Sequence, residues 1–473
     1  MQLNRRHFIQ AAGAIALPGT AFAAAAAANP RELTMDVFKQ RVRPGGAATE
    51  VWGFNGSVPG PVLRYAQGDK LDLHVVNRLK QPTTVHWHGM RVPNAMDGVP
   101  QVTQAPIEPG AAFDYRYTIE DAGTYWYHPH QSSFEQVPRG LYGALIVDEQ
   151  RPLPVDRDIV WLLADYKLDE RNAQVEDYGR VADFGARGRH GNVITINGTA
   201  AGAGRTLPLR PNERVRLRLI NGASARIFRL EFGGHAPWII AHDGQAVPPH
   251  PIGDGGLLFL APGQRTDLVL DGNAGSRKGG WAITDRRGQG SEIARIVYAG
   301  KPVRARALGQ PQALEPNRHT EVRLESATQH FLMFEGGEGG MPAIGQVDGK
   351  ALKVEDIRAQ HGLTWTMNYS AQHEHAMMHE PLFYMRKGEH VQLRMINNTL
   401  FEHPMHLHGH FFRVLALDGK PNPLREWRDT VLLGPQGSVD IAFVAENPGE
   451  WMFHCHVLDH AAGGMMGTVA VFD

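Results

Sequence analysis

A ten-residue pattern that occurs three times constrains the fold of this chain more than any other feature. It reads GDKLDLHVVN at residues 68–77, NERVRLRLIN at residues 212–221 and GEHVQLRMIN at residues 388–397. Each copy alternates polar and apolar residues, which is typical of a β-strand with one buried face. Three copies in a chain of 473 residues predict three β-sandwich units.

Two polar, proline-rich stretches, residues 148–154 and 300–316, have the composition of linkers between these units. We therefore expect the units at residues 30–150, 157–300 and 317–473. The chain contains 53 glycines and 31 prolines with only 21% charged residues, which is typical of a loop-rich β protein.

The single cysteine, Cys455, lies in the sequence His454-Cys455-His456 and is followed by His460 and Met465. A thiolate, an imidazole and a thioether are the ligand types of a blue-copper electron-transfer site. On an extended segment successive side chains point to opposite faces. Cys455 therefore faces one metal centre, while the two flanking histidines face a second one.

Further histidines occur as closely spaced pairs: His86-Trp-His88, His128-Pro-His130 and His403-Pro-Met-His406-Leu-His408. Residues two apart on a strand share a face, as the ligands of a common metal cluster must. Together with the cysteine motif, these sequences resemble those of the multicopper oxidases, the family that includes laccases and bacterial cuprous oxidases. The resemblance covers nearly the whole chain after its first thirty residues.

The resemblance implies an all-β fold of three cupredoxin-like Greek-key sandwiches and four copper ions, namely one type 1, one type 2 and a type 3 pair. It also assigns the ligands of each centre. Type 1 copper is expected at His403, Cys455 and His460 with Met465 as the weak axial ligand, type 2 copper at His86 and His406, and the type 3 pair at His88, His128, His130, His408, His454 and His456.

Counting from the last asparagine of each repeat predicts which units bind metal. Nine and eleven residues after it stand two histidines in the first and third copies, but Leu230 and Phe232 in the middle one. Six residues after it, only the third copy has a histidine, His403, where the middle copy has Ile227. We therefore expect the three-copper cluster between the first and third units, and a copper-free middle unit that acts as a spacer.

Reduction of dioxygen also consumes protons, which a carboxylate near the cluster has to deliver. Asp97 matches the family acid beside the type 2 copper and is the candidate proton relay. Many bacterial relatives carry a glutamate directly after the histidine that corresponds to His460, and this chain has Ala461 there. The proton route is therefore left open by the sequence.

The resemblance predicts an oxidase that couples four one-electron oxidations of a small substrate to the reduction of dioxygen to water. A laccase-like phenol oxidase is our main interpretation, and a cuprous oxidase for copper tolerance is the alternative. A methionine- and histidine-rich segment is a candidate accessory Cu(I) site, formed by His373, His375, Met377, Met378 and His379. A non-enzymatic cell-division-type scaffold is disfavoured because such relatives have lost the copper ligands, and a copper nitrite reductase because such enzymes lack the full cluster.

Residues 1–29 predict an export signal that is removed near Ala23. Arg5-Arg6 and the short apolar stretch after them resemble a twin-arginine signal, so we expect the twin-arginine export machinery as a partner and the periplasm as the location. No other apolar run approaches the length of a membrane span. A formal net charge of −1 and a pI near 7.1 give no indication of nucleic-acid binding.

Overall fold

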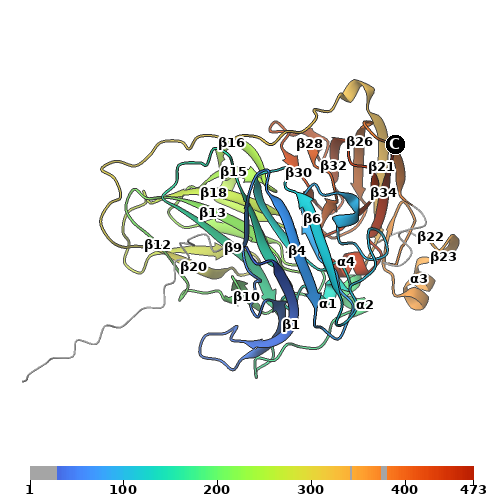
Figure 1. Ribbon diagram of the computed structural model, residues 1–473, viewed down its shortest axis with the longest axis horizontal. Helices are drawn as coiled ribbons and strands as arrows, with labels where there is room; N and C mark the ends of the chain where they lie inside the picture. The colour runs from blue at the N-terminus through green and yellow to red at the C-terminus, as the bar shows by residue number, and fades with distance from the viewer. Residues whose placement is uncertain (1–28, 341–343, 374–380) are drawn as a thin grey trace, which may run out of the picture.

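In the computed structural model, which describes residues 29–340, 344–373 and 381–473, three two-sheet units follow one another along the chain (Figure 1). The predicted export signal lies outside the described residues. The predicted all-β class is confirmed, because only four short α-helices accompany the strands of the described residues.

The first unit pairs the sheet β2-β1-β4-β6 with the sheet β3-β8-β7-β5. Its elements are β1 (Glu32–Gln40), β2 (Thr49–Phe54), β3 (Leu63–Ala66), β4 (Lys70–Asn77), β5 (His86–His88), β6 (Ala112–Thr118), β7 (Gly123–His128), α1 (Ser133–Gln136) and β8 (Gly143–Asp148).

The middle unit pairs the sheet β11-β10-β9-β13-β18-β15-β16 with the sheet β12-β20-β19-β14-β17. Its elements are β9 (Arg157–Tyr166), α2 (Val181–Phe184), β10 (Val193–Ile196), β11 (Thr199–Ala200), β12 (Thr206–Leu209), β13 (Arg214–Asn221), β14 (Phe228–Phe232), β15 (Trp238–His242), β16 (Gln245–Pro251), β17 (Leu257–Leu260), β18 (Arg265–Asp271), β19 (Trp281–Asp285) and β20 (Ser291–Tyr298).

The third unit pairs the sheet β24-β21-β26-β32-β28-β29 with the sheet β25-β34-β33-β27-β31, and β30 is added beside β28. A separate two-stranded sheet, β22-β23, accompanies them. Its elements are β21 (Thr328–Gly336), β22 (Ile344–Val347), β23 (Lys350–Lys353), α3 (Val354–His361), β24 (Trp365–Met367), β25 (Phe383–Arg386), β26 (His390–Asn397), β27 (His403–Leu407), β28 (Phe412–Leu417), β29 (Lys420–Pro421), β30 (Trp427–Arg428), β31 (Thr430–Leu433), β32 (Ser438–Val444), β33 (Gly449–Cys455), α4 (Leu458–Ala462) and β34 (Met466–Phe472).

The repeated pattern forms the strand with the same neighbours in each unit. β4, β13 and β26 pair in parallel with the first strand of their unit, which is β1, β9 or β21. On the other edge they pair antiparallel with β6, β18 and β32. The apolar positions of the pattern face the core, as the alternation predicts.

The asparagine that ends each copy holds the same turn. In Asn77, Asn221 and Asn397 the side-chain oxygen accepts the main-chain N–H two residues later at 2.9 Å. The side-chain amide donates to two main-chain carbonyls, at 2.7 to 2.9 Å. Because the asparagine is fully buried, these bonds satisfy groups that water cannot reach, and they fix how the chain enters the following strand.

Buried charges connect the first and middle units. Arg216 of β13 binds Glu149 at 2.7 Å and Asp267 at 2.6 Å. Thr124 of β7 donates to Asp267 at 2.7 Å and accepts a hydrogen bond from Arg218. Buried ions need such complete pairing, so this network fixes the position of one unit against the other.

Candidate metal centre

The expected ligands of the type 1 copper come together at the end of the β27–β33 pair. His403 begins β27, Cys455 ends β33 and His460 lies in α4. The Nδ1 atoms of both histidines lie 3.6 Å from the cysteine sulfur and 3.0 Å from each other. One thiol and two imidazoles therefore converge on one point, as in a blue-copper site.

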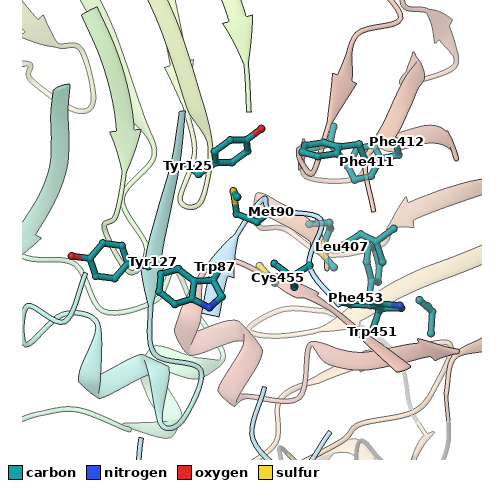
Figure 2. Close-up of a cluster of buried hydrophobic side chains, with 14 of the residues drawn as sticks. Trp87, Met90, Tyr125, Tyr127, Leu407, Phe411, Phe412, Trp451, Phe453 and Cys455 are labelled. Carbon is teal, nitrogen blue, oxygen red and sulfur yellow. The ribbon is translucent and has the colours of Figure 1, made fainter. Parts of the chain in front are cut away.

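Apolar side chains surround the cysteine. Cys455 belongs to the core cluster that also contains Trp87, Leu407 and Phe453 (Figure 2). Burial raises the pKa of the Cys455 thiol far above its usual range, so the thiolate needs a bound cation to form here. Burial also lowers the pKa of His460 to about 3, which keeps this imidazole neutral and able to bind a metal.

Two adjacent methionines follow these ligands, and the structure places them in different surroundings. Met465 lies in the same core cluster as Cys455, and its carbonyl accepts the Cys455 N–H at 3.1 Å. Met466 packs in a separate cluster with Val99 and Met452. This arrangement favours Met465 as the axial ligand, as the sequence spacing predicts.

Eight further histidines meet between the first and third units. The pairing of β5 with β7 places His86 opposite His128. Across the boundary, His88 stacks on His406 with ring centroids 3.8 Å apart, and His86 stacks on His408 at 3.9 Å. All members of the cluster are at most 3% exposed: His86, His88, His128, His130, His406, His408, His454 and His456.

Ring nitrogens inside this cluster have no hydrogen-bond partner among the described residues. They are Nε2 of His86, His128, His130 and His406, Nδ1 of His88, and both ring nitrogens of His456. In each of four overlapping groups of three, the histidine ligand atoms lie within 4.8 Å of one another. Burial lowers the pKa of His88, His128, His130, His406, His408 and His456, and that of His454 to about 3. Neutral buried imidazoles with free lone pairs are the donor set that bound copper ions would satisfy.

Comparison with known proteins agrees with this geometry. Residues 36–152, 157–300 and 350–473 each match a family model described as multicopper oxidase. The crystal structure of a multi-copper oxidase from Pseudomonas thermotolerans is 32% identical, with a TM-score of 0.80 over 93% of this chain and 98% of that one. The chain belongs to the multicopper oxidase family.

Two curated relatives span the same family. Multicopper oxidase MmcO of Mycobacterium tuberculosis is 29% identical over 93% of this chain and 88% of its own length. Laccase-1 of Cryptococcus neoformans is 27% identical over 93% of this chain and 80% of its own length. Like these relatives, the chain is an oxidoreductase, and its units have the cupredoxin-like fold that the resemblance implies. Among the described residues of this multicopper oxidase, no helix is long and apolar enough to cross a membrane.

The two candidate copper centres of the oxidase are joined through three consecutive residues. Cys455 lies in the type 1 group, while His454 and His456 each lie in a histidine group of the cluster. The opposite orientation of neighbouring side chains on β33 causes this division, as the sequence predicts. Two short covalent paths, one through His454 and one through His456, thus connect the Cys455 site with the cluster.

Asp97 is fully buried beside two cluster histidines. Its main-chain carbonyl accepts the Nδ1–H of His86 at 2.8 Å, and its carboxylate Oδ2 accepts the Nδ1–H of His408 at 2.8 Å. Each bond leaves the Nε2 of that ring free to face the cluster. The second carboxylate oxygen, Oδ1, has no hydrogen-bond partner among the described residues. Asp97 therefore orients ligands, and its proton role stays a prediction.

The middle unit carries no group of metal-ligating side chains in the part of the chain that the structure describes. Leu230 and Phe232 of β14 are buried in the core of this unit, where the flanking units have histidines. Ile227 is also buried. The residues at these positions thus serve packing.

The interpretation of the middle unit as a spacer is nevertheless too simple. Its Arg265 is completely buried and binds Asp429 of the third unit through two hydrogen bonds of 2.6 and 2.8 Å. Asp429 in turn lies 3.2 Å from His88 Nε2, and its carbonyl accepts the Nδ1–H of His406 at 2.9 Å. The middle unit therefore positions two cluster ligands through a buried ion pair.

Sequence reasoning missed Asp429 and Arg265 because the repeat predicts strands and turns but not contacts between units. Residues 262–265, Pro-Gly-Gln-Arg, have only the composition of a turn. The one available signal is the charged Arg428-Asp429 pair next to the buried strand β31, and that pattern also occurs at ordinary strand ends.

The candidate accessory Cu(I) site cannot be placed as a whole. His373 is half-buried, with its ring centroid 5.8 Å from that of His361 at the end of α3. His375, Met377, Met378 and His379 lie outside the described residues.

Proposed function

We propose that this multicopper oxidase is a laccase-like enzyme that oxidises small phenolic reductants and reduces dioxygen to water with four copper ions. The observation that carries the proposal is the placement of Cys455 in one ligand group and of its two neighbours in the other. When bound, the copper ions supply one-electron transfer and dioxygen reduction. The residues expected to hold them are those assigned above.

The protein itself supplies geometry, exclusion of water and protons. Buried rings stacked across the boundary between two units hold the cluster ligands in fixed orientations. His454 donates from Nδ1 to the Cys455 carbonyl at 2.8 Å, which directs its Nε2 into the cluster. The Asp97 carboxylate lies 2.8 Å from a cluster histidine, His408, whereas the Asp429 carboxylate lies 3.2 Å from His88. We therefore assign proton delivery to Asp97.

Copper quantitation of the purified holoprotein tests the number and type of the centres. We expect four coppers per chain and an intense blue absorption from the Cys455 thiolate. Cys455→Ser should remove the blue band and the oxidase activity and lower the content by one copper, while the cluster still binds metal. A blue Cys455→Ser protein, or an anomalous copper signal within residues 157–300, would contradict the assignment.

We base the choice of phenols on the described surroundings of the type 1 histidines. His403 Nε2 shares a 2.8 Å hydrogen bond with the Thr399 hydroxyl, and His460 Nε2 donates to the Ala186 carbonyl at 2.8 Å. Neither partner is the thioether or thiolate that selects Cu(I). Both Nε2 atoms are thus occupied by hydrogen bonds within the protein. An organic reductant that transfers its electron without binding the metal is compatible with this arrangement.

Steady-state turnover separates the two substrate classes. We expect 2,6-dimethoxyphenol to be oxidised with a kcat/KM that added Cu(II) changes little. A cuprous oxidase would instead show faster turnover of Cu(I) and strong stimulation of phenol oxidation by Cu(II). In that case, replacing Met377 and Met378 together by leucine should remove the stimulation.

Export through a twin-arginine signal is a further part of the proposal, and it is supported by residues 1–29 alone. Replacing Arg5 and Arg6 together by lysine keeps the positive charge of the segment. We expect this variant to remain in the cytoplasmic fraction, whereas the wild-type protein reaches the periplasm. Equal periplasmic yields of both proteins would contradict a twin-arginine route.

A further inference from the structure

Both type 1 histidines are closed to solvent, so electrons need a connection to the surface. His403 and His460 are at most 1% exposed. The Nε2–H of His460 binds the carbonyl of Ala186, a half-exposed residue that follows α2 in the middle unit. That carbonyl belongs to the peptide bond with Arg187, whose side chain is exposed. A hydrogen-bonded path from the type 1 site thus reaches the surface at Arg187.

Positive charge without a matching carboxylate lies at this point. The guanidinium groups of Arg187 and Arg287 have no carboxylate within 4.0 Å among the described residues, although the main-chain N–H of Arg287 donates to Asp285 at 3.2 Å. Arg287, which follows β19, instead contacts the ring of His190, with Nη2 3.0 Å from Nε2 and Nη1 3.3 Å from Nδ1. The guanidinium group of Arg287 therefore lies against a half-buried imidazole, that of His190, four residues after Ala186. Arg187, the residue that directly follows Ala186, adds a second positive charge nearby.

Electrostatics show that these groups act on one another. Burial, and then the charges of Arg287, Arg226 and Arg187, lower the pKa of His190 to about 4, so His190 is neutral at neutral pH. Burial and the Arg226 charge also lower the pKa of Arg287, and the charges of Asp165, Asp285 and Glu402 offset only part of this effect. A nearby anion would relieve this repulsion and stabilise both arginines.

The neighbouring acids are mostly engaged elsewhere. Arg226 binds Asp165 at 2.8 Å and lies 3.7 Å from Asp285. Glu402 lies 3.5 Å from Arg229. The exception is Glu338, an exposed residue whose main-chain N–H binds the Gly185 carbonyl at 2.7 Å. Glu338 is an exposed carboxylate without an ion pair among the described residues, so its removal should strengthen the binding of an anion.

We propose that Arg187, His190 and Arg287 form a docking site for reductants that carry a negative charge, above all phenolic carboxylates, beside the Ala186 bond to His460. This inference rests on the proposed function for the identity of the donor as a phenol. The bound carboxylate pairs with the guanidinium groups, and the neutral His190 can donate to a phenolate or carboxylate oxygen.

The redox balance is that of a one-electron oxidation. The phenol would give one electron through the Ala186–His460 bond, and a copper(II) ion held by His403, Cys455 and His460 would be the oxidant. The phenolic proton goes to bulk water, and the product is a phenoxyl radical that keeps its carboxylate. Four such oxidations supply the electrons for one dioxygen.

A matched pair of substrates tests the docking site. Syringate is 2,6-dimethoxyphenol with a carboxylate opposite the hydroxyl, so the ratio of kcat/KM for syringate to that for dimethoxyphenol isolates the effect of the charge. In Arg187→Gln plus Arg287→Gln we expect this ratio to fall roughly tenfold, mainly through the KM of syringate. Glu338→Gln should raise the ratio, and added salt should lower it in the wild type only.

The matched control is Arg277→Gln, which removes an exposed arginine near the opposite end of β19. This variant should keep the wild-type ratio. An unchanged ratio in the Arg187 and Arg287 double variant, or an equal fall in Arg277→Gln, would overturn the docking site.

A binding measurement separates failure of this inference from failure of the proposed function. Hexacyanocobaltate(III) is a redox-inert anion, and its affinity for the copper-free protein can be measured by calorimetry. We expect the double variant to bind it roughly tenfold more weakly than the wild type. If neither phenol is oxidised but this difference holds, the phenol assignment is wrong and the anion site stands. If the affinities are equal, the anion site is wrong whatever the enzyme oxidises.

Discussion

At the scale of single residues, Asp97 shows how one side chain serves two ligands. It binds His86 through its main chain and His408 through its carboxylate, while its second carboxylate oxygen lies 3.2 Å from His86 Nδ1 without a hydrogen bond among the described residues. A buried acceptor without a partner is costly unless something else binds it. A proton or a water molecule at Oδ1 would supply that partner, in agreement with a proton-delivering role.

Asp97→Asn tests this role because asparagine keeps the size of the side chain and can still accept the His408 hydrogen bond. Stopped-flow reduction of the type 1 copper by substrate should remain near the wild-type rate. Reoxidation by dioxygen should slow by roughly 10²–10⁴-fold, the range for a lost proton-transfer group. Reoxidation at the wild-type rate would show that Asp97 only orients the two histidines.

Ala461 occupies a position where the structure leaves little room for an acid. It is 2% exposed and packs with Val99, Met452 and Met466. A glutamate introduced there would enter apolar surroundings that raise its pKa. We expect Ala461→Glu in the Asp97→Asn background to recover only part of the reoxidation rate, and to lower the thermal midpoint of unfolding. Full recovery of both quantities would contradict this picture of the site.

At the scale of elements, the asparagine at the end of each repeat strand links fold and site. Asn397 holds the turn that leads to Thr399 and His403, whereas Asn221 holds the same turn in a unit without ligands. The turn therefore belongs to the fold of every unit, whether or not metal ligands follow it.

Asn221→Ala and Asn397→Ala form a matched pair of variants. Each leaves a main-chain N–H and two carbonyls without their buried partner, so each should destabilise the protein by about 2–5 kcal/mol. Denaturant unfolding measures this loss. Only Asn397→Ala should also shift or weaken the blue absorption, because it alone moves His403. An equal change of the blue band in Asn221→Ala would show that the effect is not specific to the turn that leads to His403.

How far the sequence predicts the molecule depends on the kind of contact. The alternation in residues 68–77 predicts β4 because one buried face imposes a period of two. The spacing around Cys455 likewise predicts which side chains share a metal, because it is local to one strand. The Arg265–Asp429 pair joins residues 164 positions apart, and neither residue belongs to a spacing pattern. The contact between His460 and Ala186 is a hydrogen bond to a main-chain carbonyl. Every residue type has such a carbonyl, so the sequence does not predict this contact.

At the scale of the whole molecule, the Arg265 ion pair joins the middle and third units next to the cluster. Arg265→Met would keep most of the volume but leave Asp429 without its cation in a buried site. We expect a loss of about 3–5 kcal/mol in the free energy of unfolding and a lower copper content. Arg277→Met, at an exposed arginine of the same unit, should change neither quantity. Equal stability of the two variants would show that the ion pair contributes little.

Neutral, partly buried histidines should make the copper-free protein sensitive to acid. Burial lowers the pKa of His190 and of His319 to about 4, whereas unfolded histidine titrates near 6.5. Between these values the unfolded chain binds more protons, so stability falls as the pH decreases from about 6.5 to 4. Each such histidine contributes about 1.4 kcal/mol per pH unit. Urea unfolding at a series of pH values measures the slope, and His319→Gln should reduce it. A slope that is flat in this window would contradict the assigned neutral state.

Gly263 of the middle unit has a consequence for protein engineering. Its φ of +84° lies in the left-handed region, and a Cβ there would come within 2.7 Å of the His456 ring and 3.1 Å of the His88 ring. A unit that has lost its own ligands is therefore not free to be exchanged or redesigned as an inert module. A chimaera that takes residues 157–300 from a relative has to keep a glycine and an arginine at the tip that touches the cluster, or it will assemble with distorted copper sites.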